Sequence, residues 1–165
     1  MKLVEKDAEK KMKNVGPSST AEAAPIVLVV DDNKAVLEFL LLLLSKNGLA
    51  GIGASSGSEC LAIVRSRQVD LIILDVMMPV MDGLEACEEL KKMCPSTPII
   101  LLTARDDMMT RAAAMDLGVS EFVAKPVNNR DLMSRIQVQL RNLEWGKAAD
   151  QVVSQIDRST SHPKK

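Results

Sequence analysis

LIILDVMMPVMDG, residues 71–83, begins with four apolar residues and then places an aspartate, Asp75, where the apolar run stops. A short run of this kind, rich in β-branched isoleucine, is typical of a strand that is buried on both faces of a parallel sheet. Asp75 would then lie at the carboxyl end of this strand. Ligands of open α/β sheets bind at that end, so the segment predicts both a fold class and the place of a site.

Apolar runs alternate with helical patterns five times along the chain. This alternation predicts a parallel sheet that is covered by helices on both faces. We therefore expect a doubly wound (βα)5 fold, an α/β three-layer sandwich around a five-stranded parallel sheet. The expected strands are residues 26–30, 50–54, 71–74, 99–102 and 121–124.

The segments between the strands carry signals that begin and end helices. Gly48 and Gly118 each follow a helical pattern and precede a strand, as glycines at helix C-termini do. Pro95 should end the third helix. Asn128 is the expected N-terminal cap of a last helix, which we expect to end at Trp145.

The chain has 165 residues, of which 47% are hydrophobic, and this matches the size of one domain. Residues 1–24 mix charges with a Gly-Pro-Ser-Ser-Thr run and have little to bury, so we expect a flexible tail there. We place the ordered domain at residues 25–146. Residues 147–165 would form a C-terminal tail that is partly helical or disordered.

Composition and charge argue against several functional classes. A net charge of −1 provides no basic field for direct nucleic-acid binding. No apolar leader follows the first residues, and the longest apolar run is far shorter than the roughly 20 residues that span a bilayer. Three cysteines without Cys-x-x-Cys spacing and a single histidine argue against a zinc site. We expect a cytoplasmic protein that binds neither membrane nor nucleic acid directly.

Acidic residues follow two of the predicted strands at their carboxyl ends. Asp31 and Asp32 follow strand 26–30, and Asp75 follows strand 71–74. Three carboxylates in one cleft repel one another and raise each other's pKa unless a cation is present. Oxygen ligands of this kind suit Mg²⁺. For the pair Asp31 and Asp32 alone, the alternative is a solvated loop or a helix cap.

A hydroxyl and a cation follow two further strands. Thr103 comes after strand 99–102, and Lys125 comes after strand 121–124. Beside three carboxylates and a metal, they would bind and neutralise the oxygens of a phosphoryl group. Asp75 would then be the nucleophile, because a carboxylate can attack phosphorus and form an acyl phosphate. The alternative is that Thr103 caps its strand and Lys125 is a surface lysine.

In this order and at this spacing, these residues resemble the receiver domain of two-component response regulators. The resemblance covers about residues 25–145 and implies the flavodoxin-like strand order 2-1-3-4-5. All five site residues agree in order and spacing, which is more specific than any single motif. The matching stretches are residues 29–33, 74–79, 81–83, 102–104 and 122–126.

The resemblance implies a phosphoacceptor and a metal site. Asp75 is implied as the phosphoacceptor. Asp31 and Asp32 are implied as ligands of Mg²⁺, together with Asp75 and the backbone carbonyl of Met77. Mg²⁺ is thus the cofactor that we expect.

Further implied roles concern the response to phosphorylation. Thr103 is implied as the switch residue that binds the phosphoryl group, and Lys125 as its counter-cation. Phe122 matches the switch aromatic, often a tyrosine, which swings inward when Thr103 moves; the alternative is an ordinary core residue. Phenylalanine lacks the hydroxyl that would hydrogen-bond in the outward position. The resemblance also implies a cis peptide between Lys125 and Pro126, and X-Pro is the linkage at which cis is least costly.

The expected function is that of a phosphorylation-activated response regulator in bacterial two-component signal transduction. Asp75 would accept a phosphoryl group from a phosphohistidine of a histidine kinase or phosphotransfer protein, and slow autodephosphorylation would follow. The chain would be a signalling switch for an unknown output protein, not a turnover enzyme, and it could form a homodimer. It would be either a stand-alone receiver, similar to the chemotaxis receivers, or a fragment of a longer regulator.

The sequence lacks the motifs of two alternative classes, a phosphatase and a dinucleotide-binding domain. A phosphatase of the haloacid dehalogenase type needs Asp-x-Asp, but Met77 stands where the second carboxylate should follow Asp75. A dinucleotide-binding domain needs a glycine-rich turn after the first strand, where Asp31-Asp32-Asn33 stands instead.

Two side chains are expected to slow hydrolysis of the phosphoryl group. Met77 and Arg105 lie two residues beyond Asp75 and Thr103, at positions that flank the path of the attacking water in the family. A thioether and a long guanidinium stem should crowd this water, which predicts a long-lived phosphoryl group. The alternative is that both side chains point to solvent.

The helix after Asp32 contains more leucines than one buried face of a helix can accommodate. Val36, Phe39, Leu40 and Leu43 have the spacing of a core stripe. A second stripe would then lie on an exposed flank, where we expect it to anchor a partner or a dimer; the alternative is that loops or the N-terminal tail cover it. This second stripe consists of Leu37, Leu41 and Leu44.

Overall fold

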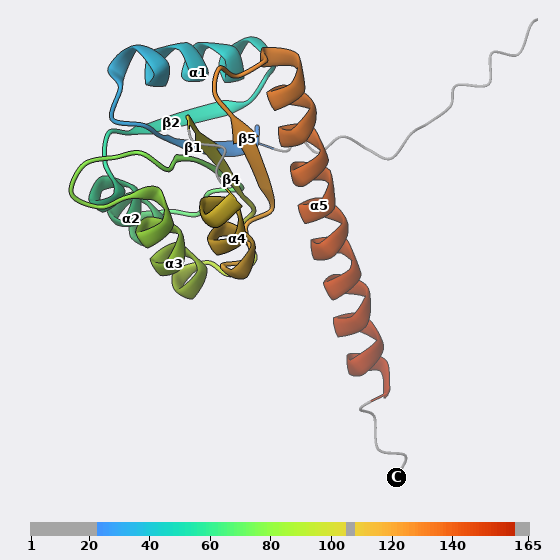
Figure 1. Cartoon of the computed structure of the whole chain (residues 1–165). Helices are drawn as coiled ribbons and strands as arrows, with labels where there is room; N and C mark the ends of the chain where they lie inside the picture. The colour runs from blue at the N-terminus through green and yellow to red at the C-terminus, as the bar shows by residue number, and fades with distance from the viewer. Residues whose placement is uncertain (1–22, 105–107, 161–165) are drawn as a thin grey trace, which may run out of the picture.

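The computed structural model of the chain describes residues 23–104 and 108–160. Strands and helices alternate along the chain, as the periodicity of the sequence predicts (Figure 1). The elements are β1 (Ile26–Val30), α1 (Lys34–Lys46), β2 (Ala50–Ala54), α2 (Gly57–Ser66), β3 (Leu71–Asp75), α3 (Gly83–Met93), β4 (Ile99–Thr103), α4 (Met108–Asp116), β5 (Glu121–Ala124) and α5 (Asn129–Thr160).

The five strands form one parallel sheet in the order β2-β1-β3-β4-β5. The predicted fold class and strand order are therefore confirmed. β3 and β4 each extend one residue further than predicted, so that Asp75 and Thr103 are the last residues of their strands. The central strands β3 and β4 are buried along their whole length, because helices cover both of their faces.

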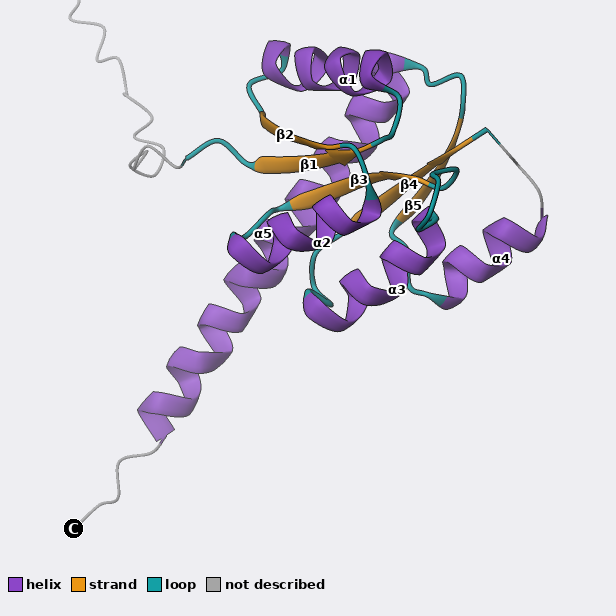
Figure 2. Cartoon of the chain, turned by 90° about the vertical axis from the view of Figure 1, so that its left-hand side faces the viewer, coloured by secondary structure: helices purple, strands orange, loops and turns teal. Residues whose placement is uncertain are grey.

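Two apolar cores lie on the two faces of the sheet. Residues alternate along each strand, so Leu28 and Ile72 contribute to one core and Val27 and Ile73 to the other. The first core packs against α2, α3 and α4, and the second packs against α1 and α5. Figure 2 shows the three layers that result.

The helix signals of the sequence are largely confirmed. Gly48 and Gly118 have φ angles of 75° and 73°, in the left-handed region that glycine adopts without a steric penalty. Pro95 follows the end of α3. The Asn128 side chain accepts a hydrogen bond from the backbone amide of Asp131 (3.1 Å), as an N-terminal cap does.

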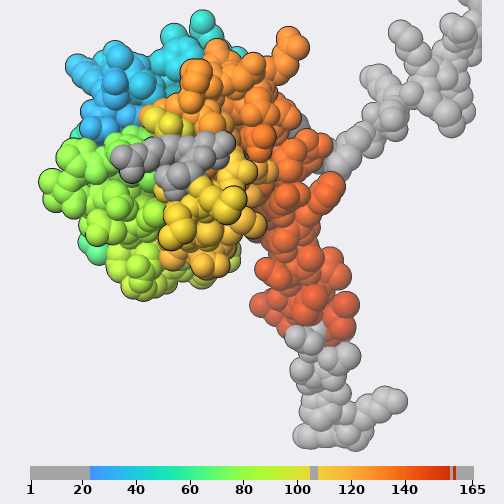
Figure 3. Space-filling view, in the orientation of Figure 1, coloured from blue at the N-terminus to red at the C-terminus, as the bar shows by residue number. Residues whose placement is uncertain are grey.

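The predicted end of the last helix at Trp145 is wrong. α5 continues without a break to Thr160 and is 32 residues long. Gly146 is its only glycine, and one glycine costs a helix only about 1 kcal/mol, whereas no proline follows within the helix. The end of α5 stands clear of the domain (Figure 3). In the described residues, no helix is both long and apolar enough to cross a membrane.

The predicted core stripe of α1 is wrong at one of its four residues. Phe39 is 47% exposed, whereas Val36, Leu40 and Leu43 pack in the core together with the buried Leu44. Leu37 and Leu41 are half-buried and pack against the core under α1. The expected docking face of Leu37, Leu41 and Leu44 is therefore not an exposed flank.

Two glycines of β2 explain the direction in which α1 faces. A Cβ atom at Gly53 would lie 3.2 Å from methyl carbons of both Leu37 and Leu41. A Cβ atom at Gly51 would lie 2.7 Å from a methyl carbon of Leu41. Because these positions lack a side chain, the leucines fill the space above β2.

Replacing Leu41 by alanine should destabilise the fold, because it removes a side chain that fills the space above Gly51 and Gly53. We expect the free energy of unfolding to fall by about 2 kcal/mol. Leu42→Ala is the matched control, since Leu42 is 55% exposed and its replacement should change stability by less than about 0.5 kcal/mol. Urea unfolding measures both. Equal stability of the two variants would contradict the packing of α1.

Candidate functional site

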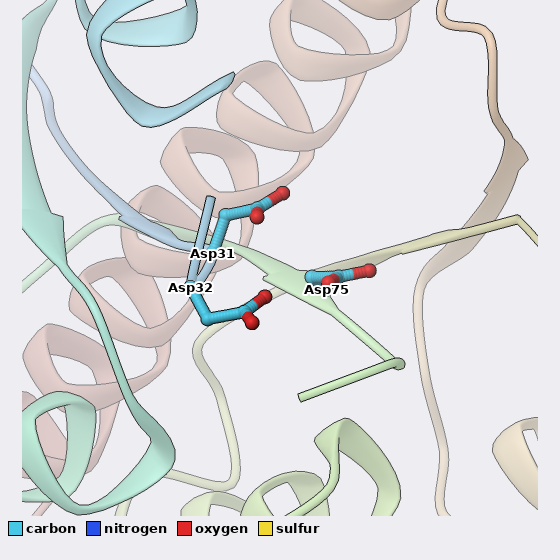
Figure 4. Close-up of side chains that lie close together, drawn as sticks. All are labelled: Asp31, Asp32 and Asp75. Atoms are coloured by element: carbon cyan, nitrogen blue, oxygen red, sulfur yellow. The ribbon is translucent and has the colours of Figure 1, made fainter. Parts of the chain in front are cut away.

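Three carboxylates meet at the carboxyl edge of the sheet. Asp31 and Asp32 follow β1, and Asp75 ends the neighbouring strand β3 (Figure 4). One carboxylate oxygen from each residue lies within 4.8 Å of the others. Asp31 and Asp75 are 1% and 3% exposed, whereas Asp32 is exposed to solvent.

The turn from β1 into α1 orients Asp31. Its backbone amide donates to the carbonyl of Ala54 on β2 (3.1 Å), which continues the sheet pairing by one residue. Its carboxylate accepts a hydrogen bond from the backbone amide of Asn33 (2.8 Å). The side chain of Asn33 in turn accepts from the amide of Ala35 and so begins α1. The helix start and the carboxylate are thus parts of one hydrogen-bonded turn.

The loop after β3 folds back onto the end of this strand. The amide of Gly83 donates to the carbonyl of Val76 (2.9 Å), and the amide of Met77 donates to the Asp75 carboxylate (3.4 Å). A Cβ atom at Gly83 would collide with the carbonyl oxygen of Asp75 and would lie 2.7 Å from Cα of Val76. Glycine at residue 83 therefore permits the close approach of the start of α3 to the end of β3.

Lys125, which follows the edge strand β5, brings a positive charge to the carboxylates. Its Nζ lies 2.9 Å from Oδ2 of Asp31 and 3.2 Å from Oδ1 of Asp75. Its amide donates to the carbonyl of Thr103 (2.7 Å), and the peptide bond to Pro126 is cis, as the resemblance implied. Burial alone would lower the pKa of Lys125, but its bonds to Asp31 and Asp75 outweigh burial and raise this pKa.

The surroundings of Asp75 raise the pKa of its carboxyl group. Burial raises its pKa most strongly, and the charge of Asp31 raises it further. Lys125 and the amide of Met77 act in the opposite direction and do not fully compensate. The ammonium group of Lys125 pairs with Asp31 and Asp75, whereas the cluster holds three carboxyl groups, so acidic groups are in excess.

The chemistry of these ligands fits Mg²⁺. All three side chains offer carboxylate oxygens, the ligands that this hard cation prefers, and a divalent charge would balance the excess. The described residues contain no second cluster of three acidic, histidine or cysteine side chains. Asp31, Asp32 and Asp75 are therefore the candidate ligands, as the sequence predicted.

Two further predicted residues lie on the adjacent strands. Thr103 is fully buried at the end of β4, opposite Ala124 of β5. Phe122 lies on β5 and is half-buried against the core under α4. The guanidinium carbon of Arg111, on α4, lies 5.1 Å from the centre of the Phe122 ring, within the range of a cation–π contact.

Sequence reasoning missed Arg111, because no local signal pairs a residue of α4 with an aromatic ring on β5. Met77, which was expected to slow hydrolysis, is 49% exposed and lines a surface cleft with Asp82 and Thr110. Arg105, its expected companion, lies outside the described residues.

Comparisons with known proteins agree with this geometry. A model of the response regulator receiver domain family matches residues 27–137. The chain is 39% identical to the response regulator MprA of Mycobacterium leprae over 137 residues, 83% of this chain and 60% of the relative. The MprA protein of Mycobacterium ulcerans is 42% identical over 128 residues, 76% of this chain and 55% of the relative. The chain thus spans less than two thirds of the length of these relatives.

Solved structures show the same fold. A CheY-like receiver domain protein from Methanospirillum hungatei has a TM-score of 0.73 and 28% identity, and the match covers 74% of this chain and 98% of that one. The chemotaxis protein CheY4 of Vibrio cholerae has a TM-score of 0.67 and 30% identity, with 70% and 98% coverage.

The contact between Gly83 and the end of β3 can be tested by adding one methyl group. Gly83→Ala should lower the free energy of unfolding by about 3 kcal/mol, because the methyl group meets backbone atoms that cannot move aside easily. Gly146→Ala is the control, since a Cβ atom there has no neighbour within 4 Å, and it should raise stability by up to about 1 kcal/mol. Urea unfolding separates the two. A Gly83→Ala variant as stable as the unmodified chain would show that the loop does not close on β3.

Proposed function

The chain belongs to the response regulator receiver domain family, and from this premise we propose that Asp75 accepts a phosphoryl group and so switches a protein-binding surface. The donor is a phosphohistidine of a histidine kinase or phosphotransfer protein. The observation that carries the proposal is the position of Asp75. This buried carboxylate lies among Asp31, Asp32 and Lys125 at the carboxyl edge of the sheet.

The transfer requires a nucleophile and neutralisation of the phosphoryl charge. A carboxylate oxygen of Asp75 attacks phosphorus, the bond from phosphorus to the histidine nitrogen breaks, and an acyl phosphate forms. The imidazole leaves with the bond's electron pair. Lys125 Nζ, 3.2 Å from the Asp75 carboxylate, neutralises negative charge that gathers on the phosphoryl oxygens.

Mg²⁺, held by Asp31, Asp32, Asp75 and the carbonyl of Met77, would supply charge neutralisation at the same oxygens. Its ligands would otherwise repel both one another and the incoming phosphoryl group. We therefore expect phosphorylation to depend on a divalent cation.

Thr103 and Phe122 transmit the change to the surface. The hydroxyl of Thr103, the last residue of β4, binds the phosphoryl group. Phe122, on the neighbouring strand β5, moves inward when Thr103 moves. Arg111 stacks on the Phe122 ring, so a movement of this ring changes the contact between β5 and α4. The face that an output protein reads would then include α4 and β5.

The proposal describes a switch that catalyses its own phosphorylation and its slow dephosphorylation. A phosphatase of the haloacid dehalogenase type would place a second carboxylate two residues after the nucleophile, where this chain has Met77. We assign the switch to the cytoplasm. Its cysteines, Cys60, Cys87 and Cys94, are all free, as is usual in a reducing compartment.

A small phosphodonor tests the role of Asp75 directly. Acetyl phosphate with Mg²⁺ should add one phosphoryl group to the chain, and Asp75→Ala should abolish the addition. Asp116→Ala, which removes an exposed carboxylate on α4, is the control and should be labelled like the unmodified chain. Intact-mass spectrometry measures the label. Chelation of Mg²⁺ should suppress it, and equal labelling of Asp75→Ala would refute the proposal.

The lifetime of the phosphoryl group tests the crowding of water by Met77 and Arg105. Both Arg105→Ala and Met77→Ala should accelerate dephosphorylation severalfold, because they open the path of the attacking water. Met115→Ala removes an exposed thioether at the end of α4 and should leave the rate unchanged. Decay of the label after removal of the donor gives each rate. An unchanged or slower rate for the first two variants would count against crowding.

A further inference from the structure

The C-terminal part of α5 projects beyond the part of the domain that the structure describes. Leu132, Ile136 and Leu140 bury the first half in the core, and Lys147 still pairs with Asp70 (3.4 Å). Beyond Asp150, which still lines a pocket with Lys91 and Pro95, the helix runs away from the domain (Figures 1 and 2). An isolated helix of this length is marginally stable in water, so a projecting end requires another source of stability.

An apolar stripe runs along the side of α5 that faces away from the domain. Its residues are spaced by seven, four, three and four positions, which keeps them on one side of a helix. At about 100° per residue, this side is roughly opposite the side that carries Ile136 and Leu140. Four of the stripe residues are large hydrophobic side chains that are 42–69% exposed. The stripe, called here the outer stripe, consists of Val138, Trp145, Ala149, Val152 and Ile156.

The outer stripe has the spacing of a two-stranded coiled coil. Val138, Trp145 and Val152 occupy successive d positions of a heptad, and Ala149 and Ile156 occupy a positions. The remaining a position is Asn142. A single asparagine at an a position is the feature that fixes the register of paired helices and favours two strands.

The positions beside the outer stripe favour a partner with the same sequence. In this heptad, five of the six e and g positions between residues 139 and 155 are uncharged. The exception is Arg141 at a g position, which in a parallel pair faces the e position of the other helix, occupied by Gly146. Two copies of α5 can therefore meet without contacts between like charges.

We propose that a second copy of this chain covers the outer stripe. The two α5 helices pair in parallel and in register, so that each residue of the stripe meets its counterpart. The domains lie on opposite outer sides of the pair, because their cores occupy the opposite side of each helix. This interface is independent of the phosphorylation of Asp75.

The oligomeric state of the whole chain, without a phosphodonor, tests the proposal. Sedimentation equilibrium over a wide range of concentration should show a transition from the 17.9 kDa monomer to twice this mass. Emission of Trp145, the only tryptophan, should shift to shorter wavelength over the same range, because the pair buries this side chain. A chain that remains monomeric at every concentration would overturn the proposal.

Paired substitutions locate the interface. The double variant Val152→Glu with Ile156→Glu should weaken the dimer by at least about 100-fold, because it places charges inside the pair. The control is Gln151→Glu with Ser154→Glu, which adds the same charge in the same turns on the other side of the helix. The control should dimerise like the unmodified chain. Equal dimerisation of both double variants would overturn the proposal.

Cross-linking tests the parallel register. Ala149→Cys should form a disulfide between the two copies under mild oxidation, because both cysteines occupy the same a position. Ser154→Cys, on the other side of the helix, should not. A dimer in which Ala149→Cys does not cross-link would exclude the parallel arrangement. Labelling of Asp75 by acetyl phosphate in each variant shows that the domain is folded, so a failed dimer is distinguished from a failed receiver.

Discussion

The parallel pairing of β1 with β3 is the constraint on which the rest of this protein depends. The register places Val30 opposite Leu74, so Asp31 and Asp75 leave the sheet side by side. Both carboxylates are almost completely buried, lose much of their hydration and repel each other. A folded chain tolerates this arrangement only if neighbouring groups compensate for it, and several features of the fold provide that compensation.

Compensation comes from segments that are far apart in the chain. Lys125 reaches both buried carboxylates from the end of β5, and the amide of Asn33 donates to Asp31 where α1 begins. The loop after β3 closes on the strand through Gly83. Within this loop Val80 has a φ of 70°, which costs a β-branched residue on the order of 1–3 kcal/mol. The fold thus gives up stability around Asp75, and under the proposed function this is the place where a cation and a phosphoryl group would bind.

Helix α5 combines two surfaces with different physical roles. Its inner side completes the core that α1 shares, through residues such as Leu132 and Ile136. Its outer side carries apolar residues that the domain does not use, and these continue past Gly146 to Ile156. Ordinary helix formers around a single glycine keep the helix intact, and pairing of the outer sides would stabilise the part that has left the domain. The proposed pairing would thus account for the part of α5 that extends beyond the domain.

The sequence by itself determined the strands, their parallel class and the polar residues at their ends, because apolar β-branched runs and the residues that end them are local signals. It did not determine which leucines of α1 face the sheet, since a helix that is apolar on most sides has no unique buried stripe. That choice depends on Gly51 and Gly53, which make room for Leu41 from another strand. The contact of Arg111 with Phe122 likewise depends on how α4 packs against β5. Only the tertiary structure decided these points, because they depend on the shapes of surfaces that distant segments present to each other.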